Sequence, residues 1–346
     1  MAAIVTGRTT VGRPVSSDRR DLFVALATVW LAGGLFLDGW AHSHVPQLET
    51  FFTPWHGVLY SGYAALAIAL VPGRLWRGRP EEPVAGWMPA GYGLGLLGAI
   101  LFAVGGVCDM TWHIAFGIEA SLEALLSPPH LVLLTAGMLM ITTPIRAAAA
   151  KQRFDDEAGR RTDVMAGSWP VLISATSATA VAAFFLSYLS PFTDAPASLS
   201  GYENAQSFGL AQYVAFTVLM VTAVLFVRSR LGRVPVGLVT LVVAAAAVPD
   251  GVFDDFENLP AQLWPLVGAV VADLVVQWVA VRQARLVPVA AGAVVPSLVW
   301  ATHLLGIEFS LGVAWSLELW SGVVVLTTLA GAVLGGLFLP ATRTGG

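Results

Sequence analysis

A succession of apolar segments, each about as long as a bilayer is thick, constrains this chain more than any other feature. A transmembrane helix needs about 20 predominantly apolar residues, and ten such segments are separated by prolines, glycines and charges. They cover residues 21–41, 54–73, 87–110, 129–147, 167–190, 207–227, 234–249, 260–281, 286–306 and 313–339. Only 12% of the residues are charged, about half the share in soluble domains. The sequence therefore predicts an all-α, polytopic integral membrane protein with about ten transmembrane helices.

The basic residues are distributed asymmetrically around these segments. All 18 Lys and Arg residues fall in the N-terminal tail, in every second loop or at its edge, where Arg146 lies near the end of the fourth segment, or after the last segment. The other five predicted loops contain none. Because cytoplasmic loops carry the excess of Lys and Arg, we expect a multi-pass protein of the cell membrane with both termini in the cytoplasm. Residues 1–20 lack the apolar core of a signal peptide and are expected to form a cytoplasmic tail.

Composition also excludes several classes of function. The single cysteine, Cys108, excludes a disulfide framework and a thiolate-rich zinc site. The net charge of -4 and the scattered basic residues argue against a nucleic-acid partner. The lipid bilayer is the expected partner.

The predicted organisation of the chain has four parts. They are a tail (1–20), duplicated hairpins (21–150), a cytoplasmic loop (151–165) and the remaining transmembrane helices (166–340).

An internal repeat in the first four predicted helices carries four of the six histidines. The pattern Asp-x3-His occurs at Asp38 to His42 and again at Asp109 to His113. The pattern Glu-x3-Ser/Thr-Pro-x-His follows each of them, at 49–56 and at 123–130. The two repeats cover about 34–78 and 105–149, and each is expected to form a helical hairpin.

Helix geometry gives this spacing a chemical meaning. Residues i and i+4 share a helix face, so each Asp-x3-His pair presents a carboxylate and an imidazole together. Thr53 and Ser127 resemble N-caps with proline at the next position, which places His56 and His130 in the first turn of the returning helix. Each hairpin should therefore bring one Asp and two His together. This donor set suits copper, zinc, iron or manganese, in two mononuclear sites or one dinuclear site.

Other polar residues are assigned lesser roles. Glu49 and Glu123 are the expected proton-handling catalytic residues of the two repeats. His44 and Glu119 have no counterpart in the other repeat and are expected to be accessory. Asp273, in the middle of a predicted helix, is expected to be a buried hydrogen-bond partner, with a proton-handling role as the alternative. The remaining candidates for peripheral or access-path roles are His303 and the acidic cluster of Asp250, Asp254, Asp255 and Glu257.

The first repeat resembles a known copper-binding segment. The stretch from Asp38 through His42 to Thr53-Pro-Trp-His56 is similar to that of the C subunit of particulate methane and ammonia monooxygenases. The resemblance covers about 34–64 and again 105–135. It implies that Asp38, His42 and His56 are copper ligands, and that the equivalent set in the second repeat is Asp109, His113 and His130.

The expected function is therefore a copper-dependent, monooxygenase-like membrane oxidoreductase or a subunit of one. Zinc or iron is the alternative metal. The substrate would be small and apolar and would arrive through the bilayer, with partner subunits or further copies of the chain as possible partners. Two other functions fit the sequence: a zinc-dependent intramembrane hydrolase, in which a Glu acts as general base, and a metal or ion transporter.

Overall fold

A computed structural model describes residues 13–45, 52–71, 88–117, 122–159, 168–199 and 203–339. Every regular element in these ranges is a helix, which confirms the all-α prediction. The chain divides into two compact units, Met1–Val181 and Ala182–Gly346. Each unit is described by itself below.

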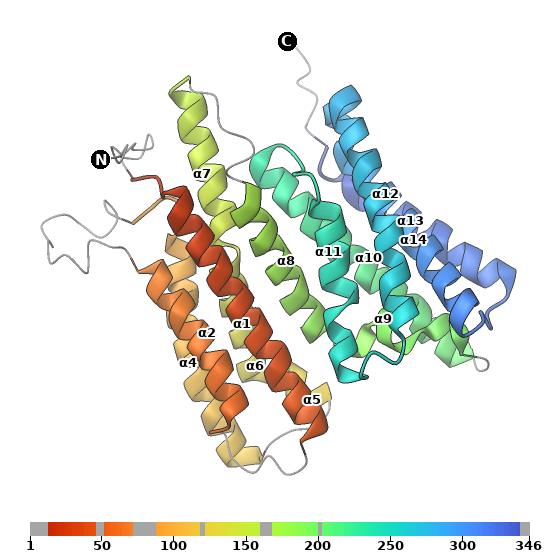
Figure 1. Ribbon diagram of the computed structural model, residues 1–346, viewed down its shortest axis with the longest axis horizontal. Helices are drawn as coiled ribbons and strands as arrows, with labels where there is room; N and C mark the ends of the chain where they lie inside the picture. The colour runs from red at the N-terminus through yellow and green to blue at the C-terminus, as the bar shows by residue number, and fades with distance from the viewer. Residues whose placement is uncertain are drawn as a thin grey trace, which may run out of the picture. The chain divides into compact units, whose positions relative to one another are not determined.

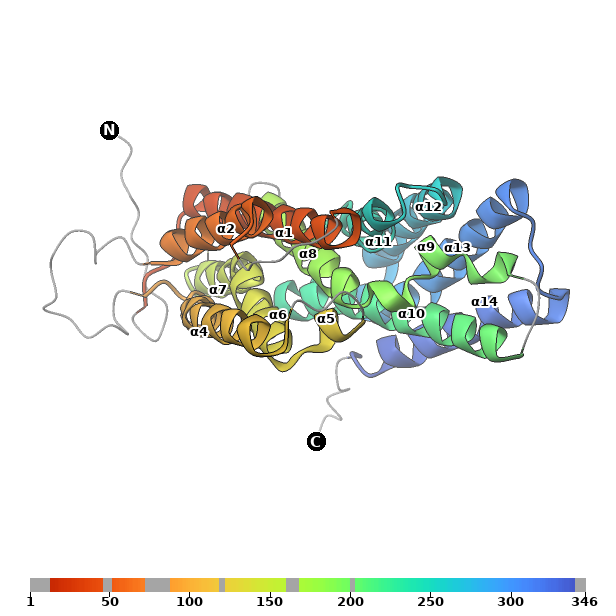
Figure 2. The same ribbon diagram turned by 90° about the horizontal axis from the view of Figure 1, so that it is seen from below.

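The first unit is built on two helical hairpins and the helices that follow them (Figure 1). In both hairpins, the second helix returns alongside the first: α1 packs against α2, and α4 packs against α6. Figures 1 and 2 show that the two hairpins turn at the same end of this unit. The helices are α1 (Asp18–His44), α2 (Pro54–Leu70), α4 (Gly93–Phe116), α5 (Leu122–Leu126), α6 (Pro128–Ile141), α7 (Thr143–Glu157) and the larger part of α8 (Ser168–Phe185).

Glycines allow α1 and α2 to approach closely. A Cβ atom on Gly34 of α1 would lie 2.8 Å from Cα of Leu59, and one on Gly62 of α2 would lie 2.9 Å from Cα of Leu31. Real Cβ atoms do not come this close to backbone, so only glycine fits at both positions. Small residues at helix interfaces are the usual device by which membrane helices pack. This close approach sets the distance between the side chains that the two helices present to each other.

The other end of the first hairpin is fixed by a charged side chain. The Nη2 atom of Arg20, near the start of α1, donates to the backbone oxygens of Ala69, Leu70 and Val71 at 3.3, 3.3 and 3.0 Å. These carbonyls end α2 and have no partner within the helix, and a cation there also interacts favourably with the helix dipole. The α1–α2 hairpin is therefore held by glycine contacts along its interface and by Arg20 at its open end.

The second unit consists mainly of long helices that pack on their neighbours in the sequence. The pairs α11 and α12, α12 and α13, and α13 and α14 are in contact, and α10 packs on α11, α13 and α14. A Cβ on Gly292 of α13 would collide with the carbonyl oxygen of Gly331 on α14. The elements are α9 (Pro191–Asp194), α10 (Glu203–Leu231), α11 (Leu238–Ala247), the short 3-10 helix η4 (Pro249–Phe253), α12 (Leu259–Gln283), α13 (Val287–Ser310) and α14 (Leu317–Gly336).

Seven segments of the described chain are long and apolar enough to cross a membrane. They are 18–44, 93–116, 128–157, 168–185, 204–231, 259–310 and 317–336, and the sixth contains both α12 and α13. Helix α2 has 17 residues, and the apolar segment of α11 and η4 is also short. The structure therefore shows the features of a multi-pass membrane protein, and the number of ten spans stays a prediction.

Candidate metal centres

The first hairpin brings Asp38, His42 and His56 together. One ligand atom from each lies within 4.8 Å of the other two. Asp38 and His42 are one turn apart near the end of α1, and His56 is in the first turn of α2. The Nδ1 atom of His56 is 3.5 Å from Oδ1 of Asp38, and Nδ1 of His42 is 3.8 Å from Oδ2. The Asp38 and His56 residues are each only 8% exposed.

Backbone and hydroxyl groups orient the two imidazoles of this group. The Nδ1 atom of His42 lies 2.8 Å from the backbone oxygen of Asp38. A carbonyl can only accept, so Nδ1 carries the proton and the lone pair is on Nε2. Thr53 is the N-cap of α2, where its Oγ1 accepts from the His56 backbone N–H at 3.1 Å. The same oxygen lies 3.0 Å from Nδ1 of His56, so the cap also positions the ring.

The second hairpin brings Asp109, His113 and His130 together in the same way. Their ligand atoms also lie within 4.8 Å of one another. Oδ1 of Asp109 is 3.5 Å from Nε2 of His113 and 3.0 Å from Nε2 of His130. Asp109 and His113 belong to the last two turns of α4, and His130 to the first turn of α6. Asp109 is 2% exposed.

In the second group, an oxygen atom contacts the Nδ1 atom of each imidazole. The Nδ1 atom of His113 lies 3.2 Å from the carbonyl oxygen of Gly117, the C-cap of α4, whose φ of 86° favours glycine. The Nδ1 atom of His130 lies 2.9 Å from Oγ of Ser127. Both rings therefore present Nε2 to the Asp109 carboxylate. Contacts of this kind to the second ring nitrogen fix the orientation of metal-binding histidines.

Two properties of the ligand atoms suit both groups to a metal ion: their chemical type and the lack of a regular hydrogen bond to one buried carboxylate oxygen in each. Oδ1 of Asp38 and Oδ1 of Asp109 are buried, and although imidazole nitrogens lie 3.5 and 3.0 Å from them, no described residue donates a hydrogen bond of regular geometry to either atom. Burying an acceptor without such a bond is costly. Ligand bonds of about 2.1 Å to a tetrahedral ion would place the donor atoms about 3.4 Å apart. The ligand atoms of each group lie within 4.8 Å of one another, close to that spacing. One carboxylate and two imidazoles suit copper, zinc or iron.

The structure places the six residues in two separate three-residue groups, and Tyr60 lies between them. Its ring stacks on His56 with centroids 6.3 Å apart and an interplanar angle of 21°. Its hydroxyl oxygen would be 2.9 Å from a Cβ on Gly106, one turn before Asp109 in α4. Sequence reasoning missed Tyr60. The available signal was its spacing, because residue i+4 from a ligand on a helix lies on the same face.

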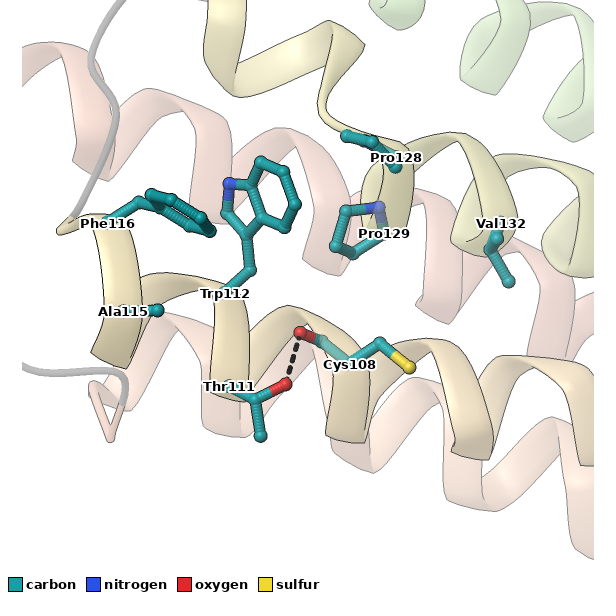
Figure 3. A pocket seen from close by; sticks show the side chains of 8 residues that line it. All are labelled: Cys108, Thr111, Trp112, Ala115, Phe116, Pro128, Pro129 and Val132. Carbon is teal, nitrogen blue, oxygen red and sulfur yellow. Dashed lines mark hydrogen bonds between the residues drawn. The ribbon is translucent and has the colours of Figure 1, made fainter.

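An apolar groove adjoins the second group, where the end of α4 faces the start of α6. Figure 3 shows Trp112 and Phe116 of α4 on one side and Pro128 and Pro129 of α6 on the other. The groove has a volume of about 500 Å³, and Cys108, Thr111, Ala115 and Val132 complete its lining. Near the first group, Trp40 and Trp55 pack edge to face, with centroids 6.0 Å apart. Apolar side chains therefore flank both groups.

The residues expected to handle protons or assist are not shown at either group. Glu49 and Glu119 lie outside the described residues, and of Glu123 only the backbone, in α5, is described. His44 stacks on Trp40, with its Nδ1 3.0 Å from the Trp40 backbone oxygen, and is in neither group. Their predicted roles stay predictions.

Polar residues of the second unit form other contacts. Asp273 is 5% exposed and accepts from Thr240 and Gln277, as expected of a buried hydrogen-bond partner. His303 is fully buried among aromatic rings, with Nδ1 2.8 Å from the backbone oxygen of Ala261. Neither belongs to one of the two Asp/His groups.

The fold and these groups define a class: a helical protein of membrane type that carries two Asp/His groups able to hold a metal ion. Comparison with models of known protein families, with curated proteins and with solved structures finds no match.

Proposed function

We propose that the chain is a membrane-embedded metalloprotein, and that it acts as a copper-dependent, monooxygenase-like oxidoreductase or as a subunit of one. The observation that carries this proposal is the pair of Asp-His-His groups, each with a buried carboxylate oxygen that accepts no hydrogen bond of regular geometry from the described residues. Ionisable groups at membrane depth are expensive and mark functional sites by default.

The residues of each group have separate tasks. Asp38 and Asp109 supply the negative charge, and their burial strengthens its attraction for a cation. The four histidines supply neutral nitrogen donors. Thr53, Ser127 and the carbonyl oxygen of Gly117 hold three of these rings in place before a metal arrives.

Copper is preferred because the first repeat resembles the copper-binding segment described above. Copper bound by these donors would supply the one-electron chemistry that oxygen activation requires. The apolar groove beside the second group favours a small apolar substrate, because Trp112, Phe116 and the two prolines offer it an open apolar surface. Further subunits or copies of the chain belong to the same proposal.

Metal analysis of the full chain, purified in a membrane mimic, tests the proposal. We expect two copper ions per chain and an electron-resonance signal of Cu(II) after oxidation. His56→Ala and His130→Ala should each remove one equivalent. His44→Ala is the matched control, because it removes an imidazole from the end of α1 that is in neither group, and it should retain both equivalents.

The other outcomes are distinct. Zinc without a resonance signal would overturn the copper assignment and favour the intramembrane hydrolase, for which hydrolytic activity would then be measured. Metal ions transported across proteoliposomes would favour the transporter. A chain that binds no metal after incubation with copper, zinc or iron would overturn the metalloprotein proposal itself.

A further inference from the structure

The turn that follows α11 in the second unit buries polar atoms without partners. Asp250, in η4, is fully buried, and both of its carboxylate oxygens lack a hydrogen bond within the described residues. Oδ2 of Asp254, four residues later, also accepts no hydrogen bond from the described residues, whereas its Oδ1 accepts from the Phe256 backbone N–H at 3.1 Å. The Ser190 hydroxyl is fully buried and faces the Asp250 carboxylate, and it does not cap α9, which it precedes. Such a concentration of unsatisfied acceptors needs an explanation.

Gln262, in the first turn of α12, points into this cluster. It is fully buried, and neither its Oε1 nor its Nε2 has a hydrogen-bond partner among the described residues. Its amide lies directly over Gly251, since a Cβ there would be 2.5 Å from Oε1 and 2.7 Å from Nε2. The amide also faces Asp254. A neutral oxygen ligand from α12 is thus added to two carboxylates, one in η4 and one directly after it.

No basic side chain of the described residues forms an ion pair with the carboxylates of Asp250 and Asp254. The sequence has no Lys or Arg between residues 234 and 281, and none between 162 and 227. Burial raises the pKa of Asp254, because the charged form is deprived of water. Asp194, exposed at the same end of the unit, adds a third carboxylate and accepts from Gln212.

We propose that this cluster is a binding site for Ca²⁺, with Asp250, Asp254, Gln262 and Ser190 as its protein ligands. The two carboxylates would neutralise a divalent ion. Asp250 can offer two oxygens, and Asp254, Gln262 and Ser190 one each, so that waters complete the six to eight oxygens that Ca²⁺ takes. The exposed carboxylate of Asp194 would attract cations toward the site.

The donor chemistry separates this site from the two Asp/His groups. Carboxylate, amide and hydroxyl oxygens are hard donors, which suit calcium and not copper. Mg²⁺ demands near-ideal octahedral geometry and keeps most of its water, so it suits a site of dispersed side-chain oxygens less well than Ca²⁺. A Ca²⁺ ion here would join η4 to the start of α12 and to the residue before α9. Its role would be to fix this end of the second unit.

Calcium binding to the full chain in detergent micelles tests the proposal, with ⁴⁵Ca²⁺ in equilibrium dialysis from about 0.01 to about 10 mM. We expect saturable binding of one ion per chain, and a rise in unfolding temperature with Ca²⁺. Asp250→Asn keeps the size of the side chain and should lower the affinity at least about tenfold. Glu257→Gln is the matched control, because it removes an exposed charge from the same turn, and it should leave binding unchanged.

Gly251→Ala keeps every ligand and tests the geometry. Its Cβ would displace the Gln262 amide, so the affinity should fall although no charge is lost. The unfolding temperatures of Asp250→Asn and Gly251→Ala are compared with that of wild type without calcium. The number of Ca²⁺ ions bound is then calculated per folded chain. The His56→Ala/His130→Ala double variant should bind Ca²⁺ like wild type, which separates this site from the proposed metal centres. The proposal is overturned if wild type shows no saturable binding, if Asp250→Asn binds equally well, or if Mg²⁺ competes with equal affinity.

Discussion

The Nε2 atom of His130 lies 3.0 Å from Oδ1 of Asp109, across the hairpin formed by α4 and α6. In the first hairpin, His56 turns its other nitrogen to the carboxylate, with Nδ1 3.5 Å from Oδ1 of Asp38. In both rings Nδ1 also contacts the hydroxyl of the N-cap residue. His130 therefore uses opposite edges for the hydroxyl and the carboxylate, whereas His56 uses one edge for both. The two groups share their donors and differ in how the second histidine is held.

The N-cap hydroxyls should control metal affinity. Removing a contact to the second nitrogen of a ligand typically lowers metal affinity about 10-fold to 100-fold. We expect Ser127→Ala to weaken metal binding at the second group by this factor with little loss of helix stability, because Ser127 makes no capping hydrogen bond. Thr53→Ala should weaken the first group and also cost about 1 kcal/mol as a lost cap. Competition with a chelator measures the affinity.

The conservative variants are the controls. Ser127→Thr and Thr53→Ser keep the hydroxyl and should retain wild-type affinity. If Ser127→Ala bound metal as tightly as wild type, the contact between Ser127 and His130 would have no role in holding the ring.

The packing of α1 on α2 should determine whether the first group forms. A Cβ on Gly62 would press on the backbone of Leu31, so Gly62→Ala should separate the helices and move His56 away from Asp38. We expect the variant to be destabilised by about 1–3 kcal/mol and to lose metal from the first group alone. Gly33→Ala, on the same helix pair, meets nothing within 4 Å and should behave like wild type. Equal metal content in Gly62→Ala would contradict the prediction.

The second group should depend on the backbone conformation of Gly117. Its φ of 86° is strained for any other residue, and its carbonyl contacts His113. We expect Gly117→Ala to cost about 1 kcal/mol or more and to lower the metal affinity of the second group. Gly312→Ala is matched in strain, with φ of 80° and open space around it, and should retain metal. Similar metal loss in both variants would show a general effect of strain.

The parts of the site that depend on local chemistry could be predicted from the sequence. Asp109 and His113 share a helix face because of their spacing, and Ser127 with Pro128 marks the start of the next helix. These features place three side chains at one hairpin turn, as the structure has them. The helical class follows from hydropathy in the same way.

The parts that depend on packing between helices could not be predicted. Tyr60 reaches Gly106 only because α2 and α4 are neighbours, and no periodicity in the sequence shows this. In the sequence, Gln262 resembles an ordinary polar residue at a helix start. Only the packing of η4 against α12 shows that its amide is buried against Gly251. Which nitrogen of His56 faces Asp38 depends on a side-chain rotamer. Three-dimensional packing decides each of these features.

Cys108 precedes Asp109 directly, and its position on the helix argues against a role as ligand. Successive residues on an α-helix point about 100° apart, and Cys108 is exposed and lines the apolar groove that Figure 3 shows. Cys108→Ser should therefore retain both metal equivalents, as measured by elemental analysis. Loss of one equivalent would instead identify the thiol as a ligand. A bulky maleimide attached to Cys108 should leave the metal content unchanged and fill the groove between Trp112 and Pro129. If the groove admits the substrate, the labelled protein should turn over substrate more slowly, whereas Cys108→Ser treated with the same maleimide has no thiol to label and should not.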